Sequence, residues 1–255
     1  MRTITFLSLL VCSLCFSIAC QNTAETTTVT KKEKPPKVAK TVELTNTITE
    51  KEIANGWQLL FDGRSLDQWK GYNLEGLPKE GWTAENGELV GDGGGDLITK
   101  EQFEDFELEL EFKLSEATNS GIFYFAQEIP NSPIYHSAPE YQLVDNATYL
   151  DKQGADFMHK HLTGDAFDLY DGVINPGIVQ NKWFNARIIS EKGQVEHWLN
   201  GKLCIEYDWN SPEWNEKIAN SKFNKETFAK VNSGHIGLQY HGNKVRFRNI
   251  KIRRI

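Results

Sequence analysis

Apolar and charged side chains alternate strictly over residues 106–114, and this period of two constrains the fold more than any other feature of the chain. Phe or Leu occupies every second position, and Glu107, Glu109, Glu111 and Lys113 lie between them. Successive side chains of an extended strand point to opposite faces. The segment therefore predicts a strand with one face in a core and the other in water.

Two Asn-Gly pairs predict tight turns between further strands. Asn86-Gly87 and Asn200-Gly201 each separate two short segments rich in apolar residues. Asn and Gly tolerate the positive φ angles of a two-residue hairpin turn, so each pair predicts a β-hairpin. Further strands are expected over 121–125, 140–144, 183–189 and 234–240.

Ten or more short strands joined by long loops predict an all-β fold, a two-sheet antiparallel sandwich. Near the end of the chain, Ile250 and Ile252 are out of phase with Val245 and Phe247. This change of phase predicts a β-bulge near Asn249.

Two insertions are too long for simple hairpin loops. They cover residues 145–162 and 207–230, and we expect short helices in them, for instance over 212–219. Long loops on a sandwich commonly border a binding site or cover a sheet edge.

The start of the chain predicts export. Arg2 precedes an almost wholly apolar run over residues 4–19, which is typical of a signal peptide and short for a membrane span. Ser17-Ile18-Ala19-Cys20 resembles a bacterial lipoprotein processing site, although Ser17 stands where Leu is usual. We therefore expect a signal peptide over 1–19, lipidation of Cys20 and a place in the bacterial cell envelope. An ordinary cleaved signal is the alternative.

Residues 20–50 predict a flexible tether, because a threonine cluster and a Lys- and Pro-rich run provide little apolar surface to bury. A single domain is expected over 51–255, with the lipid as its one membrane contact. Six of the 28 Lys and Arg residues and two of the 35 Asp and Glu residues fall within the first 40 positions, so the rest carries a net charge of −11. This charge argues against nucleic acid as a partner.

Cysteine content argues against disulfides. Cys12 and Cys15 fall in the signal peptide and Cys20 at the lipidation site, which leaves Cys204 without a partner. Its apolar neighbours Leu203 and Ile205 indicate a buried thiol instead of a nucleophile.

An ordered set of motifs carries a resemblance to one family. The set comprises Leu59-Leu60-Phe61-Asp62-Gly63-Arg64-Ser65-Leu66 with Trp69, Asn119-Ser120-Gly121-Ile122-Phe123-Tyr124, Glu140-Tyr141-Gln142-Leu143-Val144-Asp145, Thr163-Gly164, residues 195–201 and 234–242, and Phe247-Arg248-Asn249-Ile250. From about residue 57 to 255 the chain resembles the 3-keto-disaccharide hydrolase domain family. The resemblance implies a concanavalin A-like jelly roll, in agreement with the strand pattern.

The resemblance also implies chemistry on sugars oxidised at carbon 3. The ketone acidifies the proton on carbon 2, so a base can remove it and expel the group on carbon 1, and water can then add to the 3-keto-2-hydroxyglucal. The implied partner is an oxidised sugar, a 3-keto-glycoside. Such an enzyme needs a base, a stabiliser for the enolate oxygen and help for the leaving oxygen. A divalent metal ion could act as the stabiliser, but no cofactor is certain.

Two pairs of polar residues are the principal candidates for the site. Glu140 and Gln142 lie two apart on one predicted strand and share a face. Their match to the family makes Glu140 the candidate base and Gln142 a candidate for substrate binding, with a solvated strand face as the alternative. Gln239 and His241 share a face in the same way. Gln239 is a candidate for substrate binding and His241 for general acid or metal ligand, with a structural histidine as the alternative.

Other candidates for substrate binding each have a structural alternative; they are Tyr124, Asp145, His197, Trp198 and Arg248. An aspartate at a strand end can order a loop. A tryptophan can belong to the core instead of stacking on a sugar. An arginine can pair with an acidic side chain.

Metal ligands are a further possibility in one loop region. His159 and His161 have the spacing of a metal pair, and Asp165, Asp168 and Asp171 could bind calcium. Surface histidines and a solvated turn are the structural alternatives, so whether these residues bind a metal ion is unknown from the sequence.

Several enzyme classes lack their motifs here. The chain has no phosphate-binding Gly-rich loop, no Gly-x-Ser-x-Gly and no His-Glu-x-x-His. Only one carboxylate lies on the Glu140 segment, which argues against direct hydrolysis by two carboxylates. A non-catalytic carbohydrate-binding module at the cell envelope and a glycosidase for unoxidised sugars are the alternative functions. No pattern indicates an oligomeric state.

Overall fold

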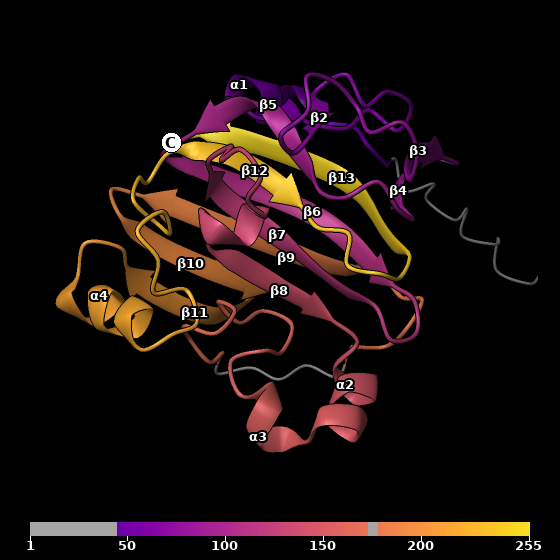
Figure 1. Cartoon of the computed structure of the whole chain (residues 1–255). Coiled ribbons are helices and arrows are strands. Elements are labelled where there is room, and N and C mark those ends of the chain that lie inside the picture. Colours follow the sequence, from indigo (N-terminus) through magenta and orange to yellow (C-terminus); the bar gives the residue numbers. More distant parts are fainter. Residues whose placement is uncertain (1–44, 173–177) are drawn as a thin grey trace, which may run out of the picture. The chain divides into compact units, whose positions relative to one another are not determined.

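The computed structural model describes residues 45–172 and 178–255 (Figure 1). The expected signal peptide, Cys20 and the tether as far as residue 44 lie outside the described residues. Within the described part of the chain, no helix is long and apolar enough to cross a membrane.

Two antiparallel sheets pack face to face and confirm the sandwich. The larger sheet has the order β11-β10-β9-β6-β13-β4-β3, with β1 also paired to β13. Its strands are β1 (Gln58–Leu59), β3 (Trp82–Glu85), β4 (Glu88–Gly91), β6 (Phe106–Leu114), β9 (Phe184–Glu191), β10 (Gln194–Leu199), β11 (Lys202–Asp208) and β13 (Val245–Arg254). The smaller sheet has the order β2-β5-β12-β7-β8. Its strands are β2 (Trp69–Gly71), β5 (Leu97–Phe103), β7 (Asn119–Ala126), β8 (Glu140–Val144) and β12 (Gly234–Leu238).

Strand β6 lies near the middle of the larger sheet, between β9 and β13, and has the alternation that its sequence predicts. Its Phe and Leu side chains are buried in the core between the sheets. One residue of the charged face differs from the expectation, because Glu107 is only 4% exposed. Its carboxylate accepts hydrogen bonds from Arg187 on β9 (2.6 Å) and Arg253 on β13 (2.8 Å), and this pairing compensates for the lost hydration.

Both Asn-Gly turns and the bulge are confirmed. The φ angles are 52° and 80° at Asn86-Gly87 and 48° and 74° at Asn200-Gly201, as a primed hairpin turn requires. Asn249 has a φ of 53°, and the register between β13 and β6 shifts there.

Short helices occupy both long insertions. After β8 come α2 (Asn146–Gln153) and α3 (Ala155–Met158), and between β11 and β12 lies α4 (Pro212–Ala219), at the predicted position. A 3-10 helix, η1 (Ile134–His136), precedes β8. The Ser211 side chain caps the start of α4, and the buried Trp214 of this helix stacks on Tyr207 at 4.8 Å. Cys204 on β11 is buried, as its neighbours predict.

The described domain begins before residue 51. Asn46 is buried, and its amide side chain donates to the Gly87 carbonyl (2.8 Å) and accepts from the Asn249 backbone N–H (2.9 Å). Asn249 returns a hydrogen bond through its own side chain, which accepts from the Asn46 N–H (2.6 Å). The helix α1 (Glu50–Ala54) follows, with Thr49 and Glu52 forming a capping box. These contacts hold the segment before α1 against the bulge of β13.

Replacing Asn46 by Ala should lower the free energy of unfolding by about 2–3 kcal/mol. Two hydrogen bonds are lost at about 1 kcal/mol each, and alanine tolerates the φ of 55° at this position less well than asparagine. Urea denaturation of the purified protein measures the change. Asn55→Ala, at the exposed end of α1, is the matched control and should stay within about 0.5 kcal/mol of the wild type. Equal stability of the two variants would contradict the role given to Asn46.

Candidate functional site

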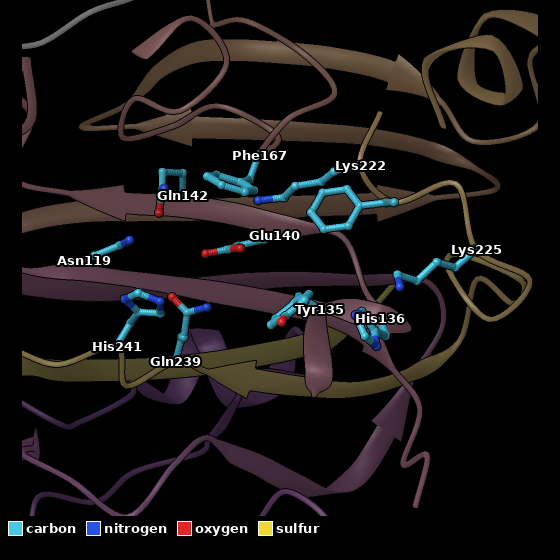
Figure 2. Close-up of a pocket in the computed structure, with 11 residues that line it drawn as sticks. Asn119, Tyr135, His136, Glu140, Gln142, Phe167, Lys222, Lys225, Gln239 and His241 are labelled. Atoms are coloured by element: carbon cyan, nitrogen blue, oxygen red, sulfur yellow. The ribbon is translucent and has the colours of Figure 1, made fainter. Parts of the chain in front are cut away.

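One pocket of about 310 Å³ lies on the face of the smaller sheet that points away from the larger sheet (Figure 2). Strands β7 and β8 and the segment after β12 form its floor, and η1, the loop after α3 and the loop after α4 form its walls. The lining residues are Asn119, Tyr135, His136, Glu140, Gln142, Phe167, Lys222, Phe223, Lys225, Gln239 and His241.

The strand period explains why Glu140 and Gln142 face this pocket. Tyr141 and Leu143 belong to the core between the sheets, so the alternate residues of β8 point the other way. Glu140 pairs with Phe123 of β7, and its side chain reaches over Gly121, where an added Cβ atom would come within 2.1 Å of the Glu140 Oε1. Only glycine leaves this space free.

Glu140 is 6% exposed, and among the described residues none donates a hydrogen bond to its carboxyl group. Burial raises its pKa from 4.5 to about 8, because water no longer stabilises the charged form. The positive charge of Lys222 opposes this rise, and the negative charge of Asp96 adds to it. A carboxyl with such a pKa can take and release a proton near neutral pH.

Amide side chains and His241 lie on one side of Glu140 (Figure 2). Among the described residues, the buried Asn119 Oδ1 and Gln239 Oε1 have no hydrogen-bond partner. The Gln142 Oε1 accepts from the Leu143 N–H (2.9 Å), whereas His241 is exposed at the rim. Two unpaired amide oxygens in one pocket favour a ligand with several hydroxyl donors.

Aromatic and basic side chains lie on the other side of Glu140 (Figure 2). The Lys222 Nζ is 4.0 Å from the ring centre of Phe167 and 5.2 Å from that of Phe223. Burial lowers the pKa of Lys222, although Asp168 and Glu140 oppose the shift. The Lys222 backbone N–H donates to the Asp168 carboxylate (2.8 Å), which joins the loop after α4 to the loop after α3. Sequence reasoning missed this wall; the length of the insertions was its only signal.

Two sequence candidates lie between the sheets, outside the pocket. The Tyr124 hydroxyl is 2.9 Å from the His197 Nε2 and 2.6 Å from the Tyr207 hydroxyl. The His197 Nδ1 is 3.2 Å from the Gly164 carbonyl oxygen. Both residues are fully buried, and burial lowers the pKa of His197 to about 3, so its ring is neutral.

Three further candidates also lie outside the pocket lining. Asp145 caps α2 and accepts from the Ala117 N–H (2.9 Å) and the Gln180 amide (2.7 Å). Trp198 donates to Glu196 (2.6 Å). Arg248 pairs with Glu111 (2.6 Å). Asp145 and Arg248 make the contacts that their structural alternatives anticipate, whereas Trp198 is half-buried and lies outside the core cluster.

The histidines and aspartates considered as metal ligands each have a protein partner. His159 is 2.8 Å from Asp171 and His161 is 3.4 Å from Asp168, and Asp165 accepts from the Leu162 and Gly172 N–H groups at 2.8 Å. Across 45–172 and 178–255, no three His, Cys, Asp or Glu side chains converge on one point. The described side chains therefore do not fit a divalent ion held by several such ligands.

Comparison with known proteins agrees with this geometry. Residues 56–253 match the family model of the 3-keto-alpha-glucoside-1,2-lyase-like domain. A 3-keto-disaccharide hydrolase from Bacteroides thetaiotaomicron is 35% identical, over 78% of this chain and 79% of the relative.

Two crystal structures of candidate glycosyl hydrolases from Parabacteroides distasonis share the fold. The first is 30% identical with a TM-score of 0.76, over 83% of this chain and 100% of the other. The second is 27% identical with a TM-score of 0.61, over 78% of this chain and 99% of the other. The matches confirm the resemblance and support a glycoside hydrolase-type function; the chain belongs to the 3-keto-alpha-glucoside-1,2-lyase-like domain family.

Proposed function

We propose that this protein cleaves 3-keto-glycosides by removing the proton from carbon 2 and eliminating the group on carbon 1. One observation carries the proposal: a buried carboxyl, Glu140, lies in the middle of a sugar-sized pocket with its pKa raised to about 8. The name of the 35% identical relative supports a keto sugar as the substrate.

The reaction balances as follows. The ionised Glu140 carboxylate takes the proton from carbon 2, and the electrons of the C–H bond move onto the ketone oxygen as an enolate. The enolate then collapses: the ketone re-forms, the electrons between carbons 2 and 3 become the second bond between carbons 1 and 2, and the bond from carbon 1 to the leaving oxygen breaks. The leaving oxygen takes a proton. Addition of water across the new double bond completes a net hydrolysis.

The two sides of the pocket suit the two substrate oxygens that gain negative charge in the reaction, the ketone oxygen and the leaving oxygen. Carbon 2 lies between carbons 1 and 3, so the leaving oxygen and the ketone oxygen lie on opposite sides of the base. We assign the ketone oxygen to the side of Gln142 and His241, which can donate hydrogen bonds, and the leaving oxygen to Lys222. A lysine whose pKa is lowered by burial is a better proton donor than an ordinary lysine.

Glu140→Gln should lower kcat by at least about 10³-fold and keep substrate affinity, because the amide fills the same space but cannot accept the proton. Leaving-group release and the ultraviolet absorbance of the unsaturated ketone measure turnover on 3-keto-disaccharides beside their unoxidised parents. The control is Glu104→Gln, at an exposed glutamate outside the pocket, which should keep wild-type rates. Binding without turnover by the wild type would favour a carbohydrate-binding module. Equal cleavage of unoxidised sugars would favour an ordinary glycosidase.

The pH profile should show the raised pKa of Glu140. The base acts only when ionised, so kcat/KM should fall as pH decreases through about 8. Removing the positive charge in Lys222→Met should move this acid limb to higher pH, because that charge stabilises the carboxylate. Lys230→Met, at an exposed lysine in the same loop, is the control and should leave the limb in place. A limb near pH 4.5 in the wild type would rule out Glu140 as the group that titrates.

At alkaline pH, Glu140→Gln should also raise the free energy of unfolding, on the order of 3 kcal/mol. Between pH 4.5 and about 8 the folded wild type holds a proton at Glu140 that the unfolded chain has released, so its stability falls as pH rises through this window. Glutamine has no such titration. Urea denaturation at pH 4 and pH 9 measures the difference, which should be small at pH 4 and large at pH 9. The same difference at both pH values would contradict the burial argument.

A further inference from the structure

The two sides of the pocket differ in the ligand chemistry that they can satisfy (Figure 2). The amide side holds two unpaired oxygen acceptors, on Asn119 and Gln239, which suit the hydroxyl groups of a sugar ring. We call the other side the aromatic-basic side; it consists of Tyr135, His136, Phe167, Lys222, Phe223 and Lys225. Three benzenoid rings there offer stacking surface.

The charged side chains that line the aromatic-basic side are basic, and the Asp168 carboxylate lies behind Lys222, where it accepts from the Lys222 backbone N–H (2.8 Å). Of the described residues that line the pocket, Glu140 is the only acidic one, and burial keeps it mostly protonated at neutral pH, whereas two lysines line the same pocket. Lys225 has no ion pair with any carboxylate of the described residues, and its charge adds to burial in lowering the pKa of His136. The domain as a whole is acidic, so a positive pocket wall is not a consequence of average composition.

Lys222 and Lys225 do not have the same surroundings. Lys222 lies beside Glu140 and Phe167, so its position suits the leaving oxygen. Lys225 lies farther along the same loop, near His136, where it can meet a group carried at the far end of the leaving group. Charge-assisted hydrogen bonds to a carboxylate are about twice as strong as neutral ones.

We propose that the aromatic-basic side is the leaving-group subsite and that it selects an aromatic leaving group bearing a carboxylate, with Lys225 as the partner of that carboxylate. This inference rests on the proposed function, because it takes carbon 2 of the keto sugar to lie at Glu140. The natural substrate class is then a 3-keto-glycoside of a phenolic acid.

The test compares two substrates that differ in one charge. These are the 3-keto-glucosides of 4-hydroxybenzoate and of its methyl ester, each as both anomers. The ester is intrinsically the better leaving group, since its carbonyl withdraws more electron density than a carboxylate does. We nevertheless expect kcat/KM to be about tenfold higher for the acid in the wild type. The preference should shrink as salt rises from low to about 1 M, because ions screen the attraction.

Lys225→Met should bring the ratio of kcat/KM for acid and ester down to about one or below. Lys230→Met, which leaves the pocket lining unchanged, should keep the wild-type ratio. Equal rates for acid and ester in the wild type, a faster ester, or an unchanged ratio in Lys225→Met would each overturn the subsite. The salt series needs no variant, so it decides the matter even if Lys225→Met folds poorly. Cleavage of 3-keto-disaccharides but of neither aryl compound would also overturn the subsite, whereas failure to cleave any of these 3-keto-glycosides would overturn the proposed function itself.

Discussion

The contact between Glu140 and Gly121 is the constraint on which the rest of the site depends. A carboxyl group lies where the Cβ atom of any other residue at position 121 would be, so β7 and β8 enclose it at their shared ladder. Enclosure removes water from the carboxyl and raises its pKa to about 8. The donors, acceptors and rings of the pocket are arranged around this buried acid, which a globular protein otherwise avoids because of its cost.

The opposite face of the same two strands gives the acid a rigid support. Tyr124 on β7 joins His197 on β10 and Tyr207 on β11 through hydrogen bonds of 2.9 and 2.6 Å, so the network ties the two sheets together. The pKa of His197 is lowered to about 3. The network therefore stays neutral over the pH range in which Glu140 changes its charge, and the base can titrate without a change in the layer beneath it.

Features that depend on neighbouring residues could be predicted from the sequence, and features that depend on loop packing could not. The period of β6, the Asn-Gly turns and the bulge at Asn249 are local, and the shared face of Glu140 and Gln142 follows from the strand period. Phe167 and Lys222 come from loops about 55 residues apart in sequence, whose meeting no periodic pattern records. His197 and Trp198 show the opposite limit: as neighbours on a strand they point to opposite faces, but the sequence could not tell that neither face of β10 lines the pocket.

The loop after α4 is held mainly by its own rings and by neighbouring loops, and not by direct pairing with β7 or β8. Phe223 stacks on Phe228 at 4.6 Å, and Thr227 donates to the His136 carbonyl (2.8 Å), so the loop is held by its own rings and by η1. Exposed positions of this loop can therefore change without breaking the hydrogen bonds between β7 and β8, which involve no residue of the loop. Relatives could therefore differ in the loop that contacts the leaving group and keep the same buried acid. The same fold could then give enzymes that release many different leaving groups.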